Sequence, residues 1–273
     1  MAHVPPPPPL PQTRLSDVVI NASGGERIVA GSTFPYSPVE GAAAPDNTWS
    51  ACNASTFNLR VGPDYARNGR KGPSAPALLQ IVGVDCVRCN GRIDNIGARV
   101  DFPPEWTDMP EYQPGVPPLF IVNMQIPSEF PTSIFKEITD GPGWSLVLYF
   151  RLTPETAQSL AYPDSAPNGN RLYTKYCQQA PEANIHSSGS SPWKARFKAT
   201  MRCQNINEFG LPSFITAYNA KPVLIRNTGN LIRGANYIEM DINVHRFGSV
   251  PKQALQVRAD NTSHATHTRK TLC

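Results

Sequence analysis

Two apolar stretches, Phe120–Pro127 and Gly143–Phe150, constrain the fold of this chain more than any other feature. Each has the length and the β-branched and aromatic content of a strand. The segment between them ends in Asp140-Gly-Pro-Gly143, which predicts a tight turn and hence antiparallel neighbours. Neither stretch carries a reactive group beside a base, since Ser145 has no histidine or carboxylate close in sequence. The pair therefore predicts the centre of a sheet and gives no sign of catalysis.

Proline limits what can surround this sheet. The 273-residue chain has 29 prolines spread along its length, which favours strands and loops over long helices. A hydrophobic content of 40% is enough for one large domain or two small ones. The net charge of +4 is mild, so it permits contact with an anionic surface and predicts no nucleic-acid partner.

Further elements complete the predicted sheet. Leu78–Val87 has apolar residues on both faces, with Val82 and Val84 on one face and Ile81 on the other, and is predicted to lie centrally. Shorter strands are predicted at Phe57–Val61 and Pro222–Arg226, and helices at Thr153–Ala161 and Arg171–Gln178. Residues 101–118 hold six prolines and are predicted to be a loop.

Two segments alternate with period two, as half-buried strands do. Lys194–Cys203 places a row of cations on one face: Lys194, Arg196, Lys198 and Arg202. Tyr237–His245 places apolar residues inward and four polar residues outward: Glu239, Asp241, Asn243 and His245. With no βαβ repeat, the chain is predicted to be an α+β fold, mainly an antiparallel sheet with one to three helices.

The cationic row has two interpretations. It could bind anionic lipid head groups. If the two period-two strands are neighbours, Glu239 and Asp241 would instead neutralise it through cross-strand ion pairs. A second basic cluster, Arg67, Arg70 and Lys71, lies in a predicted loop and could be a contact surface or simply solvated.

The sequence predicts no metal, no cofactor and no catalytic residue. Cys86-Val-Arg-Cys89 is a lone C-x-x-C without the second pair that a structural zinc site needs, and both cysteines are expected to be unreactive. His264-x-x-His267 with Cys273 lies in a polar tail, and His245 is isolated. The chain is therefore predicted not to be an enzyme.

The termini are predicted to be disordered. Residues 1–47 are rich in proline and glycine, and Pro5–Pro11 predicts a polyproline II tract that either binds an SH3, WW or profilin-type domain or is an inert tail. No signal sequence or membrane span is apparent, which predicts reduced cysteines and a cytoplasmic protein.

Eight segments in one order resemble the C-terminal domain of the plant enhanced-disease-resistance-two proteins, over residues 48–255. They are Trp49-Ser-Ala-Cys52, Phe57–Tyr65, Lys71 with Leu78–Asp85, Phe120–Pro127, Gly143–Phe150, Arg196-Phe-Lys198, Lys221–Ile225 and Gly234–Phe247. In larger plant members this domain often follows a pleckstrin-homology and a START lipid-binding module.

The resemblance implies a non-catalytic regulatory domain, 48–257, that binds a lipid or a membrane surface and has a START-like helix-grip fold. After Phe247 the chain departs from the family pattern, which predicts a C-terminally incomplete domain and a polar tail, 258–273. The alternative function is a protein-interaction or scaffold domain whose sheet is purely structural.

Overall fold

The computed structural model describes residues 18–38, 45, 48–108, 115–128, 140–179, 196–200, 216, 219–225 and 228–247, together with the backbone of 271–272. The predicted proline tract Pro5–Pro11 lies outside these residues. Of the predicted polar tail, only the backbone of β14 (Thr271–Leu272) is described, where it pairs in parallel with β3 (Thr48–Trp49).

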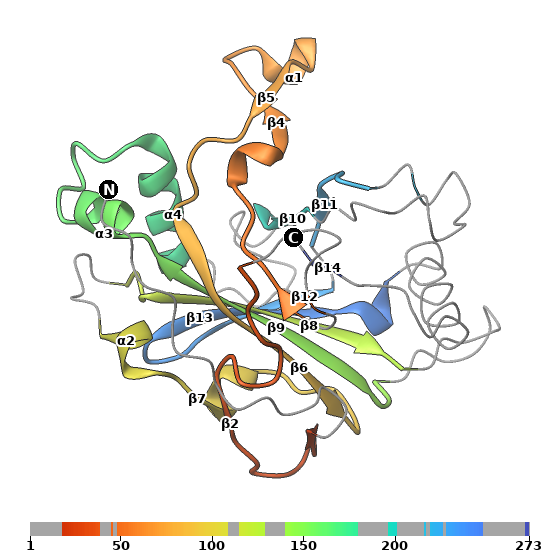
Figure 1. Ribbon diagram of the computed structural model, residues 1–273. Helices are drawn as coiled ribbons and strands as arrows, with labels where there is room; N and C mark the ends of the chain where they lie inside the picture. Colours follow the sequence, from red (N-terminus) through yellow and green to blue (C-terminus); the bar gives the residue numbers. More distant parts are fainter. Residues whose placement is uncertain are drawn as a thin grey trace.

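A mixed sheet curled into a half-barrel forms the centre of the described structure (Figure 1). Its strands, in spatial order, are β1 (Val19–Ile20), β6 (Leu79–Cys89), β9 (Gly143–Leu152), β8 (Leu119–Pro127), β13 (Tyr237–Asn243) and β12 (Gly229–Arg233). The β6–β9, β9–β8 and β13–β12 pairs are antiparallel, whereas β1–β6 and β8–β13 are parallel. The predicted α+β class and the mainly antiparallel sheet are confirmed.

The two apolar stretches form neighbouring central strands, as predicted. Phe120 of β8 lies opposite Phe150 of β9, and Gln125 lies opposite Ser145. Because side chains alternate along a strand, this register assigns each residue to one of two faces. Phe120 and Val122 lie on the face that α4 (Asn168–Gln179) covers, the helix face. Leu119 and Ile121 lie on the face that residues 90–99 cover, the loop face.

A β-bulge in β6 changes the predicted faces of that strand. The register shifts between Ile81 and Gly83, so that Ile81 and Val84 pack in one cluster while Val82 packs on the loop face. The prediction that Val82 and Val84 share a face was therefore wrong, because a bulge inserts one residue and reverses the alternation. Gly83 suits this point, since a Cβ there would lie 2.3 Å from the ring of Trp106.

The described residues contain four α-helices, where one to three were expected. α1 (Tyr65–Asn68) and α2 (Pro104–Thr107) are single turns inside segments predicted as loops. α3 (Pro154–Leu160) begins as predicted, with the Thr153 hydroxyl accepting from the Thr156 backbone N–H. α4 starts three residues before the predicted Arg171.

Besides the β3–β14 pair, the described residues form three further two-stranded sheets. They are β2 (Ile28–Val29) with β7 (Val100–Asp101), β4 (Asn58–Arg60) with β5 (Lys71–Pro73), and β10 (Lys198–Ala199) with β11 (Val223–Leu224). Of the predicted strand Lys194–Cys203, only residues 196–200 are described, and β10 covers two of them.

The segment 18–38 belongs to the fold, contrary to the predicted disorder up to residue 47. Ile20 and Ala30 are fully buried, and Phe34 is buried against Trp49 and Val84. A buried carboxylate anchors the segment: Asp85 accepts from the backbone N–H groups of Gly31 and Thr33, each at 2.8 Å. The proline and glycine composition misled the prediction, because these contacts are made to distant β6.

Candidate functional site

An apolar cavity of about 550 Å³ lies between the helix face of the sheet and α4. This volume is within the range of about 300–1,000 Å³ that small-molecule sites occupy. Its lining is almost entirely aliphatic and aromatic. The lining residues are Leu78, Leu79, Phe120, Val122, Phe150, Gly169, Leu172, Tyr173, Tyr176, Arg196, Phe197 and Lys198.

Strand alternation makes the floor of the cavity apolar. Phe120 and Val122 of β8 and Phe150 of β9 project from the helix face, while the next residue of β8, the polar Asn123, projects from the loop face. The first predicted strand pair therefore supplies the floor. The Phe197 ring stacks on Phe120, with centroids 5.9 Å apart and an interplanar angle of 12°.

α4 forms the opposite wall. Leu172, Tyr173 and Tyr176 line the cavity because residues three and four apart share a helix face. Burial raises the pKa of Tyr173 and of Tyr176 well above the ordinary tyrosine value, so both are neutral near pH 7. The Tyr176 hydroxyl is buried and makes no hydrogen bond within the described part of the chain.

Two of the four predicted head-group contacts, Arg196 and Lys198, line this cavity. Both side chains are exposed, so they lie where the apolar lining meets solvent. The other two, Lys194 and Arg202, lie outside the described residues. No measurement tests their role, which stays a prediction.

The proposed neutralisation of these cations by Glu239 and Asp241 is wrong. β10 pairs with β11, and the neighbours of β13 are β8 and β12. All seven residues of β13 are buried, because the strand has a packed layer on each face. Glu239 and Asp241, predicted to face solvent, lie instead under residues 90–99. Asn243 is buried beside Asp140, and His245 is buried just beyond the strand.

The buried carboxylates bind the covering loop through its backbone. Glu239 accepts from the N–H groups of Ile96 and Gly97, both at 2.8 Å, at the start of the 3₁₀ helix η3 (Ile96–Arg99). Asp241 accepts from the Asn95 N–H at 3.0 Å and from the Asn123 amide at 2.7 Å. The loop thus obtains its acceptors from the sheet, and the sheet residues obtain donors from the loop.

Both carboxyl groups have raised pKa values. Burial is the main cause for each, and the neighbouring Glu239 charge raises the pKa of Asp241 further, well above its ordinary value. Two adjacent buried carboxylates cannot both ionise cheaply. The pair therefore holds a proton that the unfolded chain would release.

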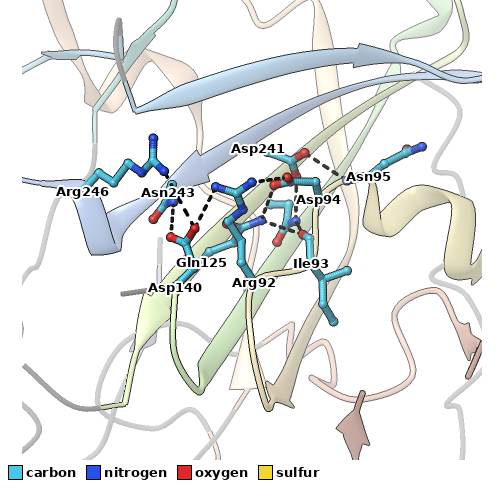
Figure 2. Close-up of polar contacts among 10 residues, drawn as sticks. Arg92, Ile93, Asp94, Asn95, Gln125, Asp140, Asp241, Asn243 and Arg246 are labelled. Carbon is cyan, nitrogen blue, oxygen red and sulfur yellow. Dashed lines mark hydrogen bonds and ion pairs between the residues drawn. The ribbon is translucent and has the colours of Figure 1, made fainter. Parts of the chain in front are cut away.

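At the rim of this face, charged residues fasten the β8–β9 connection (Figure 2). Arg92 contacts Asp94 at 2.7 Å and Asp140 at 3.1 Å, and the Asn243 amide donates to Asp140 at 2.9 Å. In Figure 2 these groups point toward one another, and the Gln125 amide donates to the Ile93 carbonyl of the loop at 2.6 Å. The arrangement closes a loop over a sheet.

The cysteine and histidine predictions have mixed outcomes. Cys86 is half-buried and Cys89 buried on β6, and burial raises the pKa of the Cys89 thiol, which disfavours the reactive thiolate. His264, His267 and Cys273 lie outside the described residues. Within the described ranges, no three His, Cys, Asp or Glu side chains are grouped to hold a metal ion, and no helix is long and apolar enough to cross a bilayer.

The cavity is the feature that the sequence did not reveal, because its walls come from segments far apart in the chain. Only one local signal pointed to it, the spacing of Leu172 and Tyr176 by one helical turn.

Comparison with known proteins gives one match. The family model described as Protein ENHANCED DISEASE RESISTANCE 2, C-terminal, matches residues 49–268. Neither the curated proteins nor the solved structures gave a significant match. The predicted domain limits of 48 and 257 stay predictions.

Proposed function

We propose that this chain, which belongs to the family of the C-terminal domain of the ENHANCED DISEASE RESISTANCE 2 protein, is a non-catalytic domain that binds a lipid. The observation that carries the proposal is the apolar cavity between α4 and the sheet, with Arg196 and Lys198 at its edge. A lipid with an acyl chain and an anionic head group matches both parts of this lining. Regulation at a membrane surface is the corresponding cellular role.

The chemistry of the lining supports binding of an acyl chain. Transfer of apolar area from water contributes roughly 25 cal/mol per Å², so a chain packed among Phe120, Val122 and Phe150 gains affinity without directional bonds. Arg196 and Lys198 attract an anionic head group at the water boundary.

The same lining supports a non-catalytic role. Among the described residues that form the cavity there is no serine, cysteine, histidine or carboxylate to act as nucleophile or base. The covering helix also agrees with the expected helix-grip likeness, which stays a prediction.

A fluorescent long-chain fatty acid, added to the purified protein, tests the proposal. Leu172→Trp enlarges a side chain that lines the cavity and is half exposed, so it should fill the site without strain in the core. We expect at least a tenfold weaker Kd for this variant. Lys198→Glu should weaken binding of the acid more than of the matching fatty alcohol, and Lys175→Glu on α4, outside the lining, should change neither.

Unchanged affinity in Leu172→Trp would contradict the cavity as the site. Absence of binding in the wild-type protein would favour the alternative, a protein-interaction domain with a purely structural sheet. Partner capture through residues 101–118 or the Pro5–Pro11 tract would support that alternative.

A further inference from the structure

A basic hairpin projects from the body of the molecule. It consists of β4, α1 and β5 and spans residues 58–73, called here the basic hairpin. In Figure 1 it stands apart from the sheet, beyond the end at which β6 begins. Residues 58–73 are described without a gap, and none of their side chains is buried. The hairpin therefore contributes no side chain to either core.

The backbone of the hairpin is nevertheless fixed. β4 and β5 pair from Asn58 with Pro73 to Arg60 with Lys71. The Val61 N–H donates to Arg70, and the Gly69 N–H closes α1 onto Tyr65, both at 3.0 Å. Gly69 has φ 65°, a left-handed conformation that glycine adopts without strain. A defined loop that buries nothing is positioned to contact something outside the domain.

Its side chains are mostly cationic. Arg60, Arg67, Arg70 and Lys71 are all exposed, against a single carboxylate, Asp64. Asp64 lies 3.5 Å from Arg67, and both side chains are more than half exposed, so this pair is weak. The other three cations have no ion pair within the described part of the chain.

Two apolar side chains lie among these charges. Leu59 is 43% exposed and Tyr65 is 47% exposed. Exposed apolar and aromatic residues surrounded by basic ones are typical of segments that insert shallowly at the boundary between lipid head groups and acyl chains.

The chain runs from the basic hairpin to the wall of the cavity within a few residues. Five residues after β5 ends at Pro73, Leu78 and then Leu79 line the cavity wall. A membrane held against the hairpin would therefore lie at the same end of the molecule as this wall.

We infer that the basic hairpin docks the domain onto an anionic membrane surface, with Leu59 and Tyr65 entering the head-group layer. The inference rests on the proposed function, because docking at this end supplies the cavity with a source of lipid. The charge of the hairpin selects anionic lipids, and its apolar pair selects a bilayer over a purely polyanionic partner.

Vesicle flotation at two salt concentrations tests the inference on the full chain. The vesicles are phosphatidylcholine alone or with 30% phosphatidylserine, roughly the anionic content of a cytoplasmic leaflet. Arg70→Ala with Lys71→Ala should weaken binding to the anionic vesicles on the order of tenfold or more. Leu59→Ser with Tyr65→Ser should also weaken it, with an effect that salt screens less. The control, Arg88→Ala with Arg246→Ala, removes two exposed cations at the opposite end of the sheet and should bind as wild type.

Binding of the fluorescent fatty acid, delivered without vesicles, separates the two proposals. Hairpin variants should keep it, since none of their residues lines the cavity. Docking through the hairpin would be overturned if the control pair lost vesicle binding equally, or if the hairpin variants kept it. Preference of the wild-type protein for RNA or an acidic protein over vesicles would also overturn it. If the wild-type protein does not bind the fatty acid, the proposed function is overturned.

Discussion

At the scale of single residues, the buried carboxylates of β13 connect the sheet to the loop that covers it. Glu239 and Asp241 are charged residues that are rarely buried without partners. Here backbone N–H groups and an amide provide those partners. Their role is to hold residues 90–99 in place.

Replacing Glu239 or Asp241 by its amide should lower the stability of the protein by different amounts. Glu239→Gln replaces an oxygen that accepts a backbone N–H by an NH₂ group, so a donor faces a donor. We expect a loss of about 1–3 kcal/mol in the free energy of unfolding, measured by urea denaturation. Asp241→Asn places an NH₂ group opposite the Asn123 amide, which can flip to present its oxygen, an atom that makes no hydrogen bond among the described residues, so this variant should cost less than Glu239→Gln. Equal losses for both variants would show that Asn123 does not adjust in this way.

The raised pKa values predict how stability depends on pH. A carboxyl group with a raised pKa binds more protons in the folded state than in the unfolded chain, so stability falls as pH rises. For Asp241 the fall begins above its unfolded value of 3.8 and continues up through its raised folded pKa.

The matched variant isolates this contribution. Asp85 also has a pKa raised by burial and adds to the same trend, so the comparison must be made between proteins. The difference in unfolding free energy between Asp241→Asn and wild type should increase in favour of the variant from pH 4 upward, by on the order of 1 kcal/mol per pH unit while Asp241 titrates. A difference that is independent of pH would show that Asp241 has no shifted pKa.

At the scale of elements, the bulge in β6 shows how one glycine shapes a strand. The Trp106 ring lies on Gly83, and a Cβ at that position would approach the ring to 2.3 Å. α2 thereby packs on the sheet through Trp106, which is buried.

Gly83→Ala should destabilise the fold by roughly 1–3 kcal/mol, because the ring or the strand must move. Gly169→Ala provides the contrast: nothing lies within 4 Å of its added Cβ, and alanine is the better helix residue. Thermal unfolding should show a lower Tm for Gly83→Ala and an unchanged or higher Tm for Gly169→Ala. A tolerated Gly83→Ala would mean that Trp106 does not pack closely there.

Local patterns were sufficient to predict several of these elements. The apolar content of β8 and β9, and the Thr153-Pro154-Glu155 start of α3, are signals contained within one segment, and the structure confirms them. The alternative in which Lys194–Cys203 lies beside β13 was wrong because the short strand β12 was not predicted. Gly234–Asn236 forms the turn between them, so β12 and β13 make a hairpin.

At the scale of the whole molecule, the sheet separates two environments. The loop face is closed by hydrogen bonds to buried polar groups, whereas the helix face leaves an apolar cavity under α4. Sequence patterns predicted apolar strands but could not predict the cavity, since Phe120, Tyr176 and Phe197 meet only after folding. For the same reason the sequence could not show that Arg196 and Lys198 line the cavity, whereas Glu239 and Asp241 lie on the opposite face of the sheet.

The central claim is that an acyl chain occupies this cavity. A crystal structure of the protein with a fatty acid brominated along its chain tests the claim most directly, because bromine is located by its anomalous signal. We predict a bromine position beside the lining side chains Val122, Phe150 and Leu172, with the carboxylate toward Arg196 and Lys198. Bromine bound elsewhere, with the space between α4 and the sheet filled by the protein's own side chains, would contradict it.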